Sequence, residues 1–256
     1  MQKEFSKRSA LKLSSLTLAV AAATLTSVSA FADTTPDCNA GTDATALECG
    51  VNAAATGVDA LAVGTDSTAT GNSTTAVGGE SVASGPGATA IGWQAVTAGN
   101  RSTALGHQTS AIGVQSVAVG EDATATGNGA IAIGGNNDVN NDGNLDEDGV
   151  GSNANGNDAV AIGAGASAQG NSTTAVGGES VATGPGATAI GWQSGANAER
   201  AQAFGHLAQA NGVRSTAVGE AAFAGGTNDT VAVGNLTQAN GNSTTVLGGE
   251  AFTGTV

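Results

Sequence analysis

The sequence predicts an all-β solenoid built from coils of 14 residues, and two observations lead to this fold class. First, a small aliphatic tripeptide that ends in glycine, such as Ala76-Val77-Gly78, recurs every 14 residues along most of the chain. Second, the residues alternate with a period of two over four or five positions, which indicates strands, and no window keeps apolar residues at helical spacing. Two short strands in a fixed repeat are typical of a stacked solenoid.

We call the glycine that closes each tripeptide the marker glycine, because it sets the register of the coils. Successive marker glycines lie 14 residues apart, except for a step of 29 from Gly134 to Gly163 and a step of 15 from Gly219 to Gly234. The series is Gly50, Gly64, Gly78, Gly92, Gly106, Gly120, Gly134, Gly163, Gly177, Gly191, Gly205, Gly219, Gly234 and Gly248. A second glycine follows most of them after seven residues, and we expect glycines to supply the positive-φ corners of a tightly wound chain. At roughly 4.8 Å per stacked strand, the series predicts a rod about 60 Å long.

Small residues dominate the positions that we assign to the interior. The residue before each marker glycine is mainly Val, Ile or Leu, and the residue before that one is nearly always Ala. With Ala, Val, Ile and Thr as the expected core, one chain buries little apolar surface per residue. Small cores need a covalent staple or a partner, so we expect a homo-oligomer.

Residues 1–32 have the pattern of a Sec signal peptide. Four basic residues lie before a mostly apolar run over residues 16–25: Lys3, Lys7, Arg8 and Lys12. Residues 30–32 (AFA) fit the cleavage rule. A transmembrane anchor is the weaker alternative, because the apolar run is short and interrupted by Thr. We therefore predict an exported protein, with no segment in the mature chain that could cross a membrane as a helix.

Removal of this leader makes the chain more acidic. The leader holds four of the 7 basic residues and one of the 21 acidic residues, so residues 33–256 keep 3 basic and 20 acidic residues, a net charge of −17. This charge argues against nucleic acid and anionic lipid as direct partners. It suits a solvated rod at a surface.

Cys38 and Cys49, the two cysteines of the chain, follow directly after the leader. In an exported protein an even number of cysteines favours a disulfide. A metal or redox site is the alternative, but further ligands and a close CxxC spacing are missing. We predict that residues 33–49 form a disulfide-bonded cap that covers the exposed edge of the first coil.

The coils of the first block run from residue 50 to 134, and those of the second from 150 to 256. The position after each marker glycine faces a turn. It holds Gly79, Trp93, His107 and Glu121 in the first block and Gly178, Trp192, His206 and Glu220 in the second. This matched order indicates that a block of about seven coils was duplicated. Trp93 and Trp192 either cover a neighbouring chain or coil or offer an exposed aromatic contact to a ligand.

An acidic insertion, residues 135–149, separates the two blocks and resembles a calcium loop. Carboxylate and amide side chains alternate along it as hard cations require, with Gly143 at the sharp turn. The candidate ligands are Asp138, Asn140, Asp142, Asn144, Asp146 and, because Gly149 stands where a bidentate Glu is usual, Asp148. The alternative is a solvated acidic loop without a metal.

The coils resemble the head repeats of trimeric autotransporter adhesins, the YadA-like head family. Residues 116–120 (SVAVG) and 159–163 (AVAIG) match that family's SVAIG core, and residues 123–127 match the A-x-A-x-G half that follows. The resemblance covers about residues 44–253. It implies a left-handed parallel β-roll, three chains side by side, and a bacterial surface protein that attaches to host matrix, cells or other bacteria. A neck, a coiled-coil stalk and a C-terminal anchor are not expected within these 256 residues.

Three function classes follow, and none is an enzyme. His107 and His206 are 99 residues apart and are expected to be turn residues, and no catalytic set can be assembled from neighbouring coils. We expect a surface adhesin head located at the cell surface or outer membrane, or secreted, with a role in virulence. A calcium-dependent structural module is one alternative. Ice binding is another, but the column four residues before the marker glycine does not keep Thr throughout: it reads Thr74, Ala88, Ser102, Ser116 and Ala130.

Overall fold

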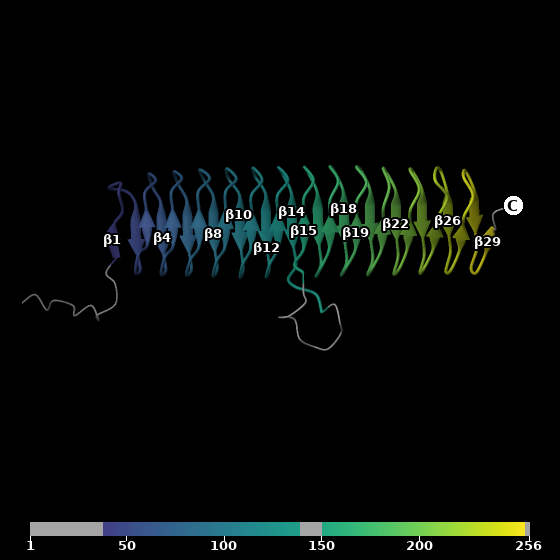
Figure 1. Ribbon diagram of the computed structural model, residues 1–256, viewed down its shortest axis with the longest axis horizontal. Helices are drawn as coiled ribbons and strands as arrows, with labels where there is room; N and C mark the ends of the chain where they lie inside the picture. Colours follow the sequence, from purple (N-terminus) through teal and green to yellow (C-terminus); the bar gives the residue numbers. More distant parts are fainter. Residues whose placement is uncertain (1–37, 139–149, 254–256) are drawn as a thin grey trace, which may run out of the picture. The chain divides into compact units, whose positions relative to one another are not determined.

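The computed structural model describes residues 38–138 and 150–253, all within the compact unit Cys38–Val256. The predicted leader, residues 1–32, lies outside the described residues. Every regular element in the described ranges is a β-strand, and the strands form two sheets that run side by side along the unit (Figure 1). No helix in this part of the chain is long and apolar enough to span a membrane.

Alternate strands belong to different sheets. The 15-stranded sheet, sheet A, consists of β1 (Cys38–Ala40), β2 (Leu47–Cys49), β4 (Leu61–Val63), β6 (Thr75–Val77), β8 (Thr89–Ile91), β10 (Thr103–Leu105), β12 (Val117–Val119), β14 (Ile131–Ile133), β16 (Val160–Ile162), β18 (Thr174–Val176), β20 (Thr188–Ile190), β22 (Gln202–Phe204), β24 (Thr216–Val218), β26 (Val231–Val233) and β28 (Thr245–Leu247). The 14-stranded sheet, sheet B, consists of β3 (Ala54–Ala55), β5 (Thr68–Ala69), β7 (Val82–Ala83), β9 (Val96–Thr97), β11 (Ser110–Ala111), β13 (Thr124–Ala125), β15 (Asn153–Ala154), β17 (Ser167–Ala168), β19 (Val181–Ala182), β21 (Gly195–Ala196), β23 (Gln209–Ala210), β25 (Phe223–Ala224), β27 (Gln238–Ala239) and β29 (Phe252–Thr253).

The pairing register confirms the predicted parallel solenoid with 14-residue coils. Ala104 of β10 pairs with Ala118 of β12, the equivalent residue one coil later. Across the insertion, β14 still pairs with β16 in the same register. The coil with one extra residue does the same, since β24 pairs with β26. The duplicated blocks are therefore offset by six strands of sheet A, from β8 to β20, and not by seven coils, because the insertion adds residues without adding a strand.

The residues that fill the interior are not all those that the sequence predicted. Ala62, Ala104 and Ala118, each at the centre of a sheet A strand, are completely buried, whereas the Val, Ile or Leu before each marker glycine faces outwards. The pleat alternates, so a strand with Ala inside must present its two flanking residues on the opposite face. The sequence pattern led us to expect Val and Ile in the core together with Ala and Thr. This expectation was wrong for Val and Ile, which lie on the outer face.

Buried hydroxyl groups complete the core and stabilise the turns. Thr74 Oγ1 donates to Gly71 O at 2.7 Å, and Ser102 Oγ donates to Gly99 O at the same distance. Both side chains are completely buried, so these bonds satisfy groups that water cannot reach. The column considered for ice binding, which includes Thr74 and Ser102, thus faces the interior and is not the outward column that this function needs.

Coils approach each other closely at both glycine columns, and the columns differ in backbone conformation. Marker glycines such as Gly92 have φ near +130°, as predicted. The second column does not supply positive φ: a side-chain carbon added to Gly99 would lie 1.9 Å from Gly113 O, so close approach of coils favours glycine there. In one coil Ala198 stands in this column. The remaining left-handed corners are filled mainly by polar residues, among them Asp66, with φ of 58°.

The first strands close one end of the stack. β1 pairs antiparallel with β2, and a disulfide joins Cys38 to Cys49 across this hairpin. The edge of β2 that would otherwise be unpaired is thereby covered.

Candidate functional surface

Stacked turns bring the variable side chains of successive coils into columns. We call the two residues after each marker glycine the marker turn. The backbone N–H of the second residue donates to the carbonyl of the first residue one coil earlier, as in Gln94 N to Gly79 O at 2.9 Å and Gln108 N to Trp93 O at 2.9 Å. The first residue of each marker turn therefore lies one strand spacing, about 4.8 Å, from the first residues of the marker turns in the two adjacent coils.

This spacing is close to the separation of stacked aromatic rings, and a Trp–His pair stacks at this spacing in each of the two blocks. The rings of Trp93 and His107 have centroids 4.8 Å apart and planes inclined by 16°. Those of Trp192 and His206 are 4.9 Å apart and inclined by 12°. Both tryptophans nevertheless remain exposed, at 44% and 45% of their surface. Each indole thus has one face covered by histidine.

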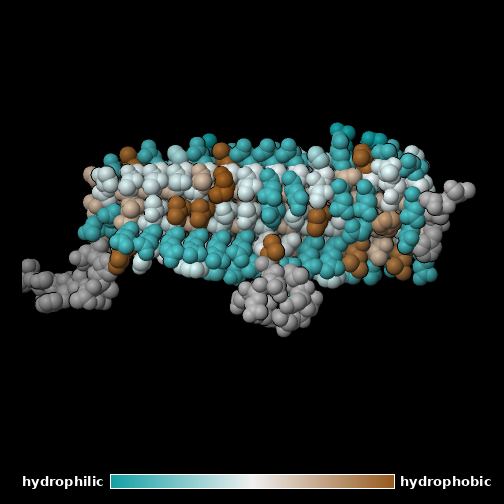
Figure 2. All heavy atoms as spheres, viewed as in Figure 1, coloured by the Kyte–Doolittle hydropathy of each residue, from teal (hydrophilic) through white to brown (hydrophobic). Residues whose placement is uncertain are grey.

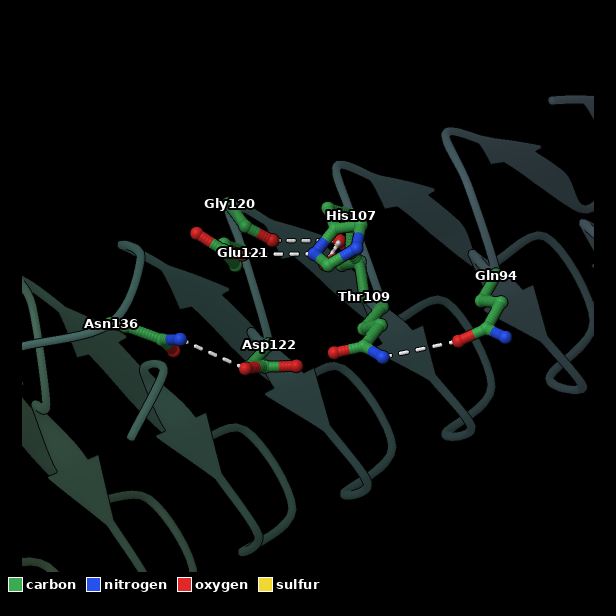
Figure 3. A network of polar contacts seen from close by, with 8 residues as sticks. Gln94, His107, Thr109, Gly120, Glu121, Asp122 and Asn136 are labelled. Carbon is green, nitrogen blue, oxygen red and sulfur yellow. Dashed lines mark hydrogen bonds and ion pairs between the residues drawn. The ribbon is translucent and has the colours of Figure 1, made fainter. Parts of the chain in front are cut away.

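Polar side chains continue the same columns. His107 Nδ1 lies 2.9 Å from Glu121 Oε1 (Figure 3). Beneath this turn the completely buried Thr109 donates its hydroxyl to the carbonyl of Gly120 at 2.7 Å. His206 Nδ1 lies 3.5 Å from Glu220 Oε1 in the second block. The glutamate holds the imidazole that supports the indole.

The second residues of the marker turns form a parallel ladder. Gln94 Nε2 donates to Glu80 Oε2 at 2.7 Å, and Gln108 Nε2 donates to Gln94 Oε1 at 3.1 Å. In the second block, Gln193 Nε2 donates to Glu179 Oε2 at 2.6 Å. A carboxylate fixed by an amide thus stands one coil before each tryptophan.

Glycine stands on the other side of each tryptophan. A side-chain carbon added to Gly79 would lie 3.2 Å from Trp93 Cδ1, and one added to Gly178 would lie 3.1 Å from Trp192 Cδ1. Neither position carries a side chain that could cover the indole. We call the sets Gly79, Trp93, His107, Glu121 and Gly178, Trp192, His206, Glu220 the first and second tetrads.

The outer faces of the two sheets differ in character. Residues that repeat along the stack form rows of similar hydropathy, as the space-filling view shows for one face (Figure 2). On sheet A, the residue before the marker glycine forms an aliphatic column whose exposed members are Ile91, Leu105, Ile133, Ile162, Ile190 and Leu247. On sheet B, the outward positions carry mostly small or polar residues, such as Thr68 and Thr70. Only sheet A therefore presents a continuous apolar column to the outside, which is aliphatic except at Cys49 and Phe204.

The predicted calcium ligands fall almost entirely outside the described residues. Asp138 is described, whereas Asn140, Asp142, Asn144, Asp146 and Asp148 are not. Over residues 38–138 and 150–253, no group of three or more His, Cys, Asp or Glu side chains is placed to hold a metal ion. Calcium binding stays a prediction.

Sequence reasoning placed the tetrads at turns, and the interpretation that Trp93 and Trp192 cover a neighbouring coil is confirmed by their stacking on the next histidine. It did not assign the histidines and glutamates to this stack. His107 and His206 are turn residues, as expected, and lie six strands of sheet A apart. The signal that could have revealed the stack is the 14-residue spacing from Trp93 to His107, because residues one period apart must lie side by side. The second tetrad repeats this spacing.

Comparison with known proteins gives a family match across the chain. The family described as "YadA head domain repeat (2 copies)" matches residues 55–81, 83–109, 111–137, 149–166, 168–194, 196–222 and 224–251. Among curated proteins, nothing matches. Among solved structures, the chain is similar to the "crystal structure of the collagen-binding domain of Yersinia adhesin YadA", with 19% identity, 80% of this chain and 74% of that chain covered, and a TM-score of 0.22. A TM-score this low carries no argument, so the assignment rests on the repeats.

Proposed function

The chain belongs to the family of YadA head domain repeats, adhesin-type domains of trimeric autotransporters, and from this premise we propose that it is an exported adhesin head that works as a homotrimer. Family members of this kind are structural and adhesive domains, not enzymes. The proposed function has two parts: association of three chains, and attachment of the trimer to host matrix, host cells or other bacteria at the cell surface.

The observation that carries the trimer is the outer face of sheet A. Its aliphatic column runs along the whole stack, and Leu105 keeps 46% of its surface exposed in the single chain. A continuous apolar column of this length on a soluble chain marks an interaction surface. A face about 60 Å long and three residues, about 10 Å, wide offers about 600 Å². This area approaches the roughly 800 Å² per partner of a stable interface.

A second copy of the chain fits this face better than an unrelated partner does. The column repeats with the period of the coils, so an identical stack offers an identical ladder of aliphatic side chains at the same spacing. Contact between such faces buries Val, Ile and Leu that the thin alanine interior leaves outside. Association thereby supplies the apolar burial that one chain lacks.

The trimer is tested by measuring the molar mass of residues 33–256 by light scattering after size exclusion. We expect the wild type to have three times the mass of one chain. Leu105→Glu places a charge in the aliphatic column and should give monomers, whereas Thr70→Glu on sheet B is the matched control and should remain trimeric. Circular dichroism of each variant checks that the coils stay folded. A monomeric wild type would refute the trimer.

Attachment is tested separately with the trimer. The Yersinia adhesin domain named above is a collagen-binding domain, so collagen-coated surfaces and host cells are the first probes. We expect retention of the wild type on at least one of these surfaces and self-association of cells that display it. Absence of binding to matrix, to cells and between displaying cells would contradict the adhesive role.

A further inference from the structure

We propose that each tetrad forms a binding slot for a cationic side chain, Lys or Arg, of a basic polypeptide. This inference deepens the proposed function, on which it rests, by naming a partner class for the adhesin surface. The slot consists of the free face of Trp93 or Trp192, the side-chain-free position at Gly79 or Gly178, and the carboxylate that follows that glycine.

The first step is that the indole face is open. His107 covers one face of Trp93, and the residue in the same column on the opposite side is Gly79. The indole is therefore held flat by its histidine and leaves the other face available. An aromatic ring that is supported from behind is prepared to accept a ligand without further loss of side-chain entropy.

The second step is the charge on the residue that follows each glycine. Glu80 follows Gly79 directly, and its Oε2 accepts a hydrogen bond from Gln94 at 2.7 Å. An indole face together with a carboxylate is a favourable environment for an ammonium or guanidinium group. The second tetrad repeats this arrangement with Glu179 and Gln193 at 2.6 Å.

The third step is that the chain supplies no lysine of its own for this slot. Residues 33–256 contain no Lys, and their three Arg residues (Arg101, Arg200 and Arg214) lie on turns half a coil away from the marker turns. With 20 acidic residues, this part of the chain attracts cations over its whole length. A neutral saccharide could also stack on indole, but it would gain nothing from this charge.

The fourth step compares the two copies. Beyond Gln94 the blocks have diverged: residues 95–105 and 194–204 differ at nine of 11 positions. One coil further on, His107 and His206 are kept although the next residue changes from Gln to Leu. Glu121 and Glu220 are kept although the next residue changes from Asp to Ala. The support of the indole is thus retained in coils that have changed around it.

The two slots have a fixed separation. Six strand steps of about 4.8 Å place the tetrads about 29 Å apart along the stack. An extended polypeptide rises about 3.3 Å per residue, so cations about nine residues apart would reach both slots. Simultaneous engagement turns two weak contacts into a tighter one.

Intrinsic fluorescence provides the test, because Trp93 and Trp192 are the two tryptophans of the chain. The trimer of residues 33–256 is titrated with a tryptophan-free peptide that carries Lys at positions 1 and 10. We expect a saturable change in fluorescence that weakens with salt. A peptide with Lys at positions 1 and 4 should bind at least about tenfold more weakly, as it reaches one slot only. A peptide with acetylated lysines should not bind.

Two kinds of variant keep the test independent of folding. Gly79→Leu with Gly178→Leu covers the open indole faces but retains both tryptophans, and should abolish the fluorescence change. Glu80→Gln with Glu179→Gln removes the charge and should weaken binding at least about tenfold. Asn235→Ala, in the same column outside the tetrads, is the control and should bind like the wild type.

Several outcomes would overturn the proposal. Equal binding of acetylated and free lysine peptides, or a response to a neutral oligosaccharide alone, would exclude cation recognition. Loss of the trimer in a Trp93→Ala, Trp192→Ala variant would show that the indoles are subunit contacts. A trimer that adheres to cells but ignores these peptides would leave the proposed adhesin intact and reject the slots alone.

Discussion

Close approach of coils at the marker glycines should make one methyl group costly. Gly134 has φ of 146°, and a side-chain carbon there would lie 2.4 Å from Gly163 O in the next coil. Restoring ordinary contact, at 3.4 Å or more, requires the two backbones to separate by about 1 Å. Such a movement would break the bond from Gly163 N to Ile133 O, now 2.8 Å long.

The expected magnitude follows from these two effects. Forcing alanine into this backbone conformation costs about 1–3 kcal/mol. Each lost hydrogen bond adds about 1 kcal/mol, and one or two are at risk. We expect Gly134→Ala to lower the free energy of unfolding by about 2–5 kcal/mol. The free energy of unfolding of a typical domain is roughly 5–15 kcal/mol, so this loss is a large part of it.

Two further glycines separate the causes. Gly135→Ala should be neutral or stabilise by up to about 1 kcal/mol, because the added carbon would lie 3.7 Å from its nearest neighbour, Glu121 N, and the backbone is ordinary. Gly248 has φ of 126° but nothing within 4 Å of the added carbon, so Gly248→Ala isolates the backbone strain.

Urea unfolding followed by far-ultraviolet circular dichroism, at one fixed chain concentration, measures the first two variants of residues 33–256. Gly248 lies in the last described turn of sheet A, so its effect is read from amide hydrogen exchange of β28. Equal midpoints for Gly134→Ala and Gly135→Ala would refute the reasoning. A cost at Gly248 as large as at Gly134 would assign the whole effect to strain.

Three other perturbations have expected outcomes. Replacing Cys38 and Cys49 by Ser should lower the free energy of local unfolding of the first coils by about 2–3 kcal/mol, which amide hydrogen exchange would report as faster exchange there. Exchange in the last coils should not change and serves as the internal control. Ala118→Val should cost about 1–3 kcal/mol in urea, because its site is completely buried between sheets; an unchanged midpoint would mean that the interior has room. Arg214 donates to both carboxylate oxygens of Asp229 and lowers its pKa, so the pair supports folding above the ordinary Asp pKa and loses this support as pH falls through the lowered pKa. NMR titration should show that lowered pKa, and Arg214→Gln should return it towards the ordinary value; because the pair is exposed, the urea midpoint should hardly move.

The strands and their register were predictable from sequence because marker glycines fix them. Which side of each strand faces inwards was not. Ala118 and Val119 are both apolar, and alternation gives the period of a strand but not its phase. The larger residue would be buried in a chain that folds alone, whereas here Val119 and its equivalents lie on the outer face of sheet A.

The candidate site was predictable to a similar extent. The order of the tetrads is visible in the sequence, and so is their position after the marker glycines. That Trp93 and His107 lie side by side follows from the 14-residue period, and the pairing of β8 with β10 confirms it. The orientation of the two rings, with planes inclined by 16°, was not predictable from the period. The indole face is open because Gly79 has no side chain. The sequence shows this glycine but not how the indole of Trp93 lies relative to it.

The pairing of β14 with β16 and of β24 with β26 has a consequence for how such a chain changes over generations. Steps of 29 and 15 residues keep the same register as steps of 14. The stack therefore has a structural reading frame. A duplication of whole 14-residue units lengthens the molecule by complete strands, whereas an insertion of another length is absorbed at one corner and leaves every later coil in phase. The number of coils and the insertions at their corners can therefore change independently of each other.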